Sequence, residues 1–178
     1  MGKAWVMRPL RPLNVTTSTT AAGFDASNML NDHGGVVWKS AGDATGVNIN
    51  IDMGVPVALD AILLFGCTNA SQDWTLRIRS ADDAALSVNM TQHTANGPFL
   101  AGEVLPVHGR GVGYWEASAP ITPRRYWLVQ ISDLNNAPVT VARLAMGQRI
   151  QLHRNFAFGG AWGVRDLGEV NFSDRGVR

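Results

Sequence analysis

Alternation between apolar and polar residues is the dominant pattern along this chain. In residues 47–52 the apolar side chains fall on one face of an extended backbone and the polar side chains on the other, which is the period of a half-buried strand. Residues 74–79 repeat the pattern, with arginines on the polar face. Both segments are therefore predicted to be strands that cover a hydrophobic core.

Two later segments, residues 126–131 and 139–146, are rich in the β-branched and aromatic residues that strands favour. Clusters of turn-forming residues, such as Asp82-Asp83 and residues 95–98, separate runs of this kind. About five or six strands divided by such turns indicate an all-β fold, an antiparallel β-sandwich.

Helical patterns are scarce, because no segment keeps a 3.6-residue apolar repeat over three turns. The best candidate is a single turn at Ala26–Leu30, which Asp25 is expected to cap. Asn31 and the glycines Gly34-Gly35 are expected to end this turn.

Composition narrows the class of protein. The chain has 178 residues, of which 46% are hydrophobic and 16% charged, and its formal net charge is +1, which suits one domain with its own core. The near-neutral charge argues against capture of nucleic acid or anionic lipid. No window is apolar enough to span a membrane, and the first residues lack the apolar core of a secretory signal. We therefore expect no nucleic-acid partner, no membrane insertion and synthesis in a reducing cytoplasm.

Cys67 is the only cysteine in the chain, so no intramolecular disulfide is possible. It follows an apolar run, and no flanking base or positive charge would lower its pKa. We interpret Cys67 as a buried small hydrophobe, with a reactive thiol as the alternative.

Catalytic motifs are missing from the sequence. There is no Gly-x-Ser-x-Gly elbow and no P-loop, and residues 109–113 lack the strand-to-helix context of a phosphate-binding turn. The histidines are scattered without the spacing of a zinc site: His33, His93, His108 and His153. The sequence therefore predicts no enzyme, no catalytic residue and no cofactor.

Several segments together resemble a known family. Residues 28–40, NMLNDHGGVVWKS, are similar to the early segment of discoidin or coagulation factor 5/8 type C domains, in which Asn-Ala-Val-Asp-Gly-Asp is followed after four residues by Trp. Residues 51–54 resemble the family's Val-Asp-Leu-Gly, and residues 57–65 its next strand. Residues 123–129 resemble its Ala-Arg-Tyr-Val-Arg-Ile strand, and residues 141–146 its closing strand.

The resemblance implies a jelly-roll-like, galactose-binding-type sandwich whose loops at one end hold a sugar, a lipid headgroup or a protein. It covers about residues 12–147. The domain organisation expected from it is an N-terminal extension at 1–11, a discoidin-like sandwich at 12–147 and an extended C-terminal arm at 148–178.

Compared position by position, this sequence departs from the calcium loop of the family. Asn31 stands where the family has the aspartate of its calcium loop, and Asp32 stands where glycine is typical. Calcium takes six to eight oxygen ligands, with carboxylates among them. No metal site is therefore predicted, and Asp32 is the single weak calcium candidate.

In sugar-binding relatives a histidine follows the tryptophan that corresponds to Trp38 and an arginine follows the next buried strand, but here Lys39 and Thr68 stand at these positions, so classical galactose recognition is not expected. Lys39 offers a donor to a hydroxyl, and Trp38 is expected in the core, with stacking on a pyranose ring as the alternative. The ligand-binding candidates on this basis are His33, Trp38, Lys39, Asn69, Ser71 and Asp73.

The C-terminal arm is rich in aromatic residues but has no regular period, so it is poorly suited to bury itself as a helix or sheet. We expect it to dock on a neighbouring subunit, with wrapping around its own sandwich as the alternative. The residues expected to make intersubunit contacts are Phe158, Trp162, Arg165, Phe172 and Arg175.

Residues 160–168 and 172–177, with residues 8–12, also resemble segments of tail-tip or baseplate proteins of long-tailed bacteriophages. This resemblance implies a structural virion protein, made in the host cytoplasm, whose partners are other tail subunits and copies of itself in a ring. A host-surface glycan is a further expected partner. The alternative hypothesis is a carbohydrate-binding module that recognises cell-surface glycans.

Overall fold

The computed structural model describes residues 5–42, 45–102 and 109–151. These residues form an all-β structure with one short 3-10 turn, η1, which confirms the predicted fold class. Within the same ranges, no helix has the length and apolar character needed to cross a bilayer. The elements are β1 (Trp5–Pro9), β2 (Asn14–Thr17), η1 (Ala26–Leu30), β3 (Trp38–Lys39), β4 (Gly46–Val57), β5 (Ala61–Thr68), β6 (Thr75–Ala81), β7 (Thr91–Pro98), β8 (Arg110–Glu116), β9 (Arg124–Ser132), β10 (Thr140–Val141) and β11 (Arg143–Gln151).

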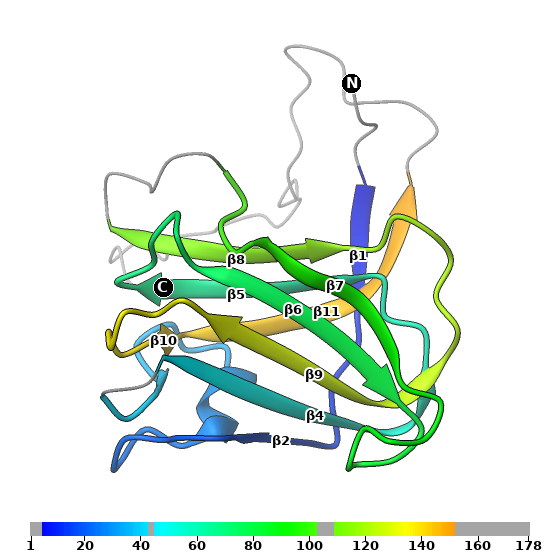
Figure 1. Cartoon of the computed structure of the whole chain (residues 1–178), viewed down its shortest axis with the longest axis horizontal. Helices are drawn as coiled ribbons and strands as arrows, with labels where there is room; N and C mark the ends of the chain where they lie inside the picture. Colours follow the sequence, from blue (N-terminus) through cyan, green and yellow to red (C-terminus); the bar gives the residue numbers. More distant parts are fainter. Residues whose placement is uncertain (1–4, 43–44, 103–108, 152–178) are drawn as a thin grey trace, which may run out of the picture.

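The strands form two antiparallel sheets that face each other. A four-stranded sheet has the order β1-β11-β5-β8, and a five-stranded sheet has the order β2-β4-β9-β6-β7. Figure 1 shows β4, β9 and β6 side by side, with β2 and β7 at the margins of this sheet. A short pair, β10-β3, joins at one end. The order places β4 and β6 on either side of β9, so residues distant in sequence share one surface.

The core lies between the sheets and follows the predicted alternation. Val47, Ile49 and Ile51 of β4 are at most 1% exposed, while Asn48 and Asn50 lie on the opposite, outer face. Large aromatic side chains from other segments complete the core, and Trp38 is among them with no exposed surface. The expectation that Trp38 is a core residue is therefore confirmed.

Two local predictions were wrong. Residues 95–98 do not form a turn, because they belong to β7, which pairs with β6 through shifts in register that accommodate the extra residues. Strand β8 was missed because its glycines weaken a strand signal. Gly113 of β8 is buried, and a Cβ there would lie 2.7 Å from the Phe99 ring, so the glycine allows this close packing.

The predicted helical turn is present at Ala26–Leu30, but the side chain of Asp25 does not cap it. Instead, the backbone carbonyl of Asp25 accepts a hydrogen bond from the Asn28 N–H at 3.0 Å. A 3-10 turn bonds residues three apart, so in this single turn the backbone supplies the acceptor that a capping side chain supplies elsewhere.

Cys67 is fully buried on β5, as the interpretation as a small hydrophobe requires. Its thiol donates to the Leu64 carbonyl at 3.4 Å. Burial raises the pKa of Cys67 to about 12, so the thiol stays protonated at neutral pH.

Strands β1 and β11 form an antiparallel ribbon, in which β1 lies within the predicted N-terminal extension and β11 crosses the predicted boundary after residue 147. Residues 147–151 of β11 pair with β1, whereas its first residues pair with β5. On the face of the ribbon that continues the core side of the sheet, Val6 and Ile150 are opposite each other and about half exposed, at 50% and 54%.

The domain division stays a prediction. Outside the described residues lie the predicted intersubunit contacts Phe158, Trp162, Arg165, Phe172 and Arg175.

His93 of β7 is held between the rings of Trp115 and Trp127, at centroid distances of 5.6 and 5.1 Å. Its Nε2 lies 2.8 Å from the Ser80 hydroxyl, which has no exposed surface. Burial, and secondarily the positive charge of Arg124, lowers the pKa of His93. A serine beside a histidine is a potential nucleophile and base, but a buried hydroxyl is out of reach of a substrate.

The structure is expected to lose stability at mildly acidic pH through His93. The pKa of His93 is lower in the folded chain than the ordinary 6.5 of an unfolded chain. The contribution of His93 to stability is therefore complete above pH 6.5 and is lost as the pH falls through the folded-state pKa. Urea unfolding between about pH 7.5 and pH 5 should show a falling free energy of unfolding. The fall should be smaller in His93→Gln, and an equal fall in both proteins would contradict this origin.

Candidate functional site

One end of the sandwich collects three loops that carry most of the predicted ligand residues. Lys39, at the end of β3, pairs with Thr140 of β10. The Thr140 hydroxyl in turn is hydrogen bonded to the Thr68 hydroxyl and accepts the Thr68 N–H at 3.0 Å. Lys39 and the loop that begins at Asn69 are therefore placed on either side of Thr140.

The loop between β5 and β6 presents short polar side chains. Asn69 has a positive φ of 61°, and its side-chain amide donates to the Pro138 carbonyl at 3.3 Å, which ties this loop to the one before β10. The Ser71 hydroxyl accepts the Asp73 N–H at 3.2 Å and donates to the Asp73 carboxylate at 3.2 Å. These bonds fix the positions of an amide, a hydroxyl and a carboxylate at the surface.

Trp38 does not take part in this surface. It has no exposed area, and its Nε1–H donates to the Thr20 hydroxyl at 3.2 Å. A ring that stacks on a sugar needs one face open to solvent, so Trp38 offers no binding platform in this structure.

Phe24 is an exposed aromatic ring at this end, and it was not among the residues predicted from sequence. It is 37% exposed, and the Lys39 Nζ lies 5.8 Å from the centre of its ring. The Ala21 N–H donates to the Lys39 carbonyl at 2.9 Å, so the loop with Phe24 is attached to β3. The available signal was an aromatic residue directly after Gly23, where a turn exposes its side chain.

His33 lies in a turn after η1, where its N–H donates to the Asn31 side chain at 2.9 Å. The adjacent Asp32 is an exposed side chain that forms an ion pair with Arg143 of β11 at 2.8 Å. This segment is therefore attached to the four-stranded sheet. Across residues 5–42, 45–102 and 109–151, no three histidine, cysteine or acidic side chains gather as a metal site would require.

A hollow of about 390 Å³ adjoins the loop between β5 and β6. Gln72 of that loop lines one side, and Pro98, the last residue of β7, lines the other together with Leu100 and Gly102. The hollow adds apolar wall beside Ser71 and Asp73. The loop end thus combines hydrogen-bond donors and acceptors, among them a positive and a negative group, with apolar surface. This combination suits non-covalent recognition of a polar ligand.

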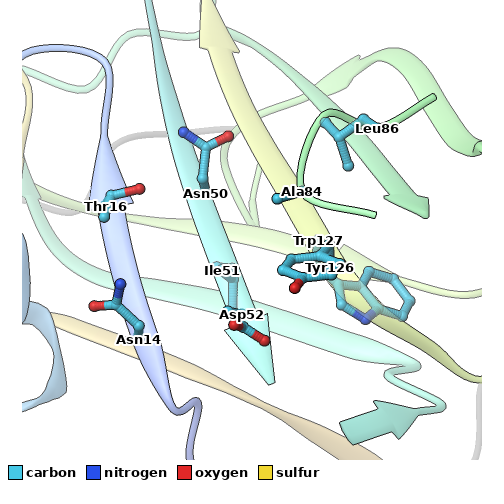
Figure 2. A pocket seen from close by; sticks show the side chains of 9 residues that line it. All are labelled: Asn14, Thr16, Asn50, Ile51, Asp52, Ala84, Leu86, Tyr126 and Trp127. Carbon is cyan, nitrogen blue, oxygen red and sulfur yellow. The ribbon is translucent and has the colours of Figure 1, made fainter. Parts of the chain in front are cut away.

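A second hollow, of about 400 Å³, lies on the outer face of the five-stranded sheet. Figure 2 shows side chains of β2, β4 and β9 along its floor and the loop of Ala84 and Leu86 at its border. We call it the sheet groove, and it is lined by Asn14, Thr16, Asn50, Ile51, Asp52, Ala84, Leu86, Tyr126 and Trp127. None of these residues was predicted from sequence to belong to a site.

No protein-family model and no curated protein matches the chain. Solved structures do. The chain is similar to chitosan-binding module 1 of a chitosanase/glucanase from Paenibacillus sp. IK-5, with a TM-score of 0.59 and 17% identity over 78% of this chain and 96% of that chain. It is also similar to the family 32 carbohydrate-binding module of Clostridium perfringens NanJ in complex with galactose, with a TM-score of 0.54 and 12% identity over 76% of this chain and 93% of that one.

Some similar structures belong to enzymes. A fucosidase from Ruminococcus gnavus matches with a TM-score of 0.55 and 11% identity, and the match covers 77% of this chain but only 25% of that chain. At such identities the similarity shows the fold alone. The chain therefore has the galactose-binding-type β-sandwich fold that is found in family 32 carbohydrate-binding modules.

Proposed function

We propose that this chain is a non-catalytic carbohydrate-binding sandwich and that its loop end binds the sugar. The observation that carries the proposal is the exposed ring of Phe24 next to Lys39, flanked by the fixed polar loop of Asn69, Ser71 and Asp73. Sugars present both hydroxyl groups and apolar C–H faces, so their sites combine directional polar groups with an aromatic or apolar wall.

The fold supports this proposal. Modules with the same fold are named for chitosan binding or are seen with galactose, and the corresponding module of AlyQ is in complex with 4,5-unsaturated mannuronic acid. These ligands differ in charge, but all of them carry hydroxyl groups on a sugar ring. The proposal for this chain is accordingly a hydroxyl-rich sugar.

Each loop-end residue has a role in the proposed complex. The Lys39 ammonium donates to a hydroxyl or a uronic acid carboxylate, and the Asp73 carboxylate accepts from neighbouring hydroxyl groups. The Asn69 amide can do both. Phe24 provides the apolar surface on which a pyranose C–H face packs.

Calorimetric titration with galactose and with mannuronate oligosaccharides tests the site. Lys39→Ala and Phe24→Ala are each expected to weaken binding about tenfold or more, because a charge-assisted hydrogen bond or an aromatic contact contributes more than about 1.4 kcal/mol. Phe65→Ala is the matched control, since Phe65 is exposed to a similar extent, 39%, on the outer face of the four-stranded sheet. Unchanged affinity in both loop-end variants would remove the loop end as the site.

A second candidate function is that of a structural subunit, the virion tail component suggested by the termini. The exposed pair Val6 and Ile150 favours it, because this pair leaves apolar surface uncovered on the ribbon that carries both ends of the described chain. In this proposal the ribbon contacts other tail subunits or copies of the chain, and the loop end faces outward toward a host glycan.

A further inference from the structure

We infer that the sheet groove is a second binding site, for a neutral oligosaccharide. The inference rests on the proposed sugar-binding function and extends it to a different surface, because the groove lies on the outer face of β2, β4 and β9 and not at the loop end. The sites are therefore separable by mutation.

The pairing of β2, β4 and β9 aligns the side chains that form the floor of the groove. Asp52 of β4 is paired with Asn14 of β2 on one side and with Tyr126 of β9 on the other, and Asn50 is paired with Thr16 in the next row. Neighbouring strands lie about 4.8 Å apart, and residues two apart on a strand share a face. In the row of Asp52, polar side chains come from three adjacent strands, so a chain molecule that crosses the strands there meets a polar group on each one. In the row of Asn50 the polar groups come from β2 and β4, because the residue of β9 is Leu128.

The polar groups of the floor are available to a ligand. In the part of the chain that the structure describes, the side chains of Asn14, Thr16 and Asn50 make no hydrogen bond to another protein group. Elsewhere on the same sheet face, polar side chains are already paired within the protein. The Arg77 guanidinium, for example, donates to the Ala95 carbonyl and to the Gln130 side chain. Amide and hydroxyl groups supply both donors and acceptors, which sugar hydroxyls require.

The charge of the groove is balanced. The Asp52 carboxylate accepts two hydrogen bonds from the Arg125 guanidinium, at 2.8 and 2.9 Å, and one from the Gly54 N–H at 2.7 Å. The hydrogen bonds from Arg125 lower the pKa of Asp52, so this ion pair stays intact at neutral pH. No lysine, arginine or histidine lines the groove within the described residues. An anion finds no free positive charge there, so a neutral sugar is the better match.

A fixed loop forms the border of the groove. The Asp83 carboxylate accepts the N–H groups of Ser87 and Val88 at 2.8 and 2.7 Å, and Asp82 forms an ion pair with Arg124 of β9 at 3.1 Å. The loop places Ala84 and Leu86 at the edge of the groove, with the Tyr126 ring nearby on β9 (Figure 2). Ala84 and Leu86 provide the apolar wall for the C–H faces of a sugar, and one face of the Tyr126 ring is covered by the Arg125 guanidinium, 4.9 Å from its centre.

The inference is tested by NMR titration of the full-length chain with neutral tetrasaccharides of glucose, mannose and galactose, and with tetramannuronate as the anionic probe. We expect at least one neutral probe to shift the backbone amide signals of β2, β4 and β9 in a saturable way. The double variant Asn14→Ala/Asn50→Ala is expected to weaken this binding about tenfold or more. Asn48→Ala is the matched control, because Asn48 is on the same strand and face but does not line the groove.

The outcomes separate the two sites. Shifts on β2, β4 and β9 that persist in Lys39→Ala and are lost in the double variant support the sheet groove, whether or not the loop end binds. Shifts confined to residues 69–73 and to Phe24 would overturn the sheet groove and leave the proposed function standing. Shifts at neither surface would overturn both, and tighter groove binding of tetramannuronate than of every neutral probe would overturn the assigned ligand class.

Discussion

Replacing Trp38 with alanine is expected to lower the free energy of unfolding by about 3–5 kcal/mol, as for other fully buried tryptophans. Trp38 has no exposed surface and is one of the largest side chains in the core. The substitution also removes the donor to Thr20, which anchors the segment before Phe24. Urea unfolding followed by tryptophan fluorescence and circular dichroism measures the loss.

The same variant separates a core role from a ligand role. Trp38→Phe keeps most of the buried volume and is expected to retain more stability than Trp38→Ala. If Trp38→Ala unfolded at the same urea concentration as the natural chain but no longer bound sugar, then Trp38 would be an exposed binding residue and the description of the loop end would be incorrect.

The second large effect is expected for Gly147→Ala. Gly147 pairs with Pro9 of β1 and Ala61 of β5, and a Cβ added there would lie 2.0 Å from the Arg8 carbonyl oxygen. Backbone atoms cannot yield as a flexible side chain can, so β1 must move away from β11. Hydrogen exchange should show loss of amide protection in β1 and in residues 148–151, while β4, β6 and β9 stay protected.

Gly34→Ala is the matched control, because no atom lies within 4 Å of the added Cβ. Retained protection of the β1 amides in Gly147→Ala would contradict the described pairing of β1 with β11. The variant also tests the structural-subunit proposal. If the ribbon is the assembly surface, Gly147→Ala should lose incorporation into particles and keep sugar binding, and normal incorporation would count against that proposal.

The strands buried on one face could be predicted from sequence. Strands β4 and β6 keep a two-residue period because their outer faces meet water. Strand β9 has three consecutive buried residues, Trp127, Leu128 and Val129, and it was predicted instead from its β-branched and aromatic residues and from the resemblance. Strand β1 has no such period, since it pairs at the margin of the sheet with only one neighbour. Strand β8 contains Gly111 and Gly113, whose absent side chains remove the pattern that alternation relies on.

The candidate sites were predictable to different degrees. Lys39, Asn69, Ser71 and Asp73 follow strand ends, and the resemblance placed those ends together. The sheet groove depends instead on register, which places Asn14 beside Asp52 and Asp52 beside Tyr126. Nothing local in the sequence marks such a row, because each residue alone is an ordinary outward-facing polar position on a strand.

Binding of the full-length chain to an array of immobilised glycans, which includes galactosides, mannuronates and neutral glucans and mannans, tests the proposed carbohydrate-binding function directly. We expect saturable binding to at least one of these glycans in the millimolar to micromolar range, competed by the free sugar and reduced in Lys39→Ala. The absence of saturable binding to every glycan on the array, with the chain folded, would contradict the carbohydrate-binding function.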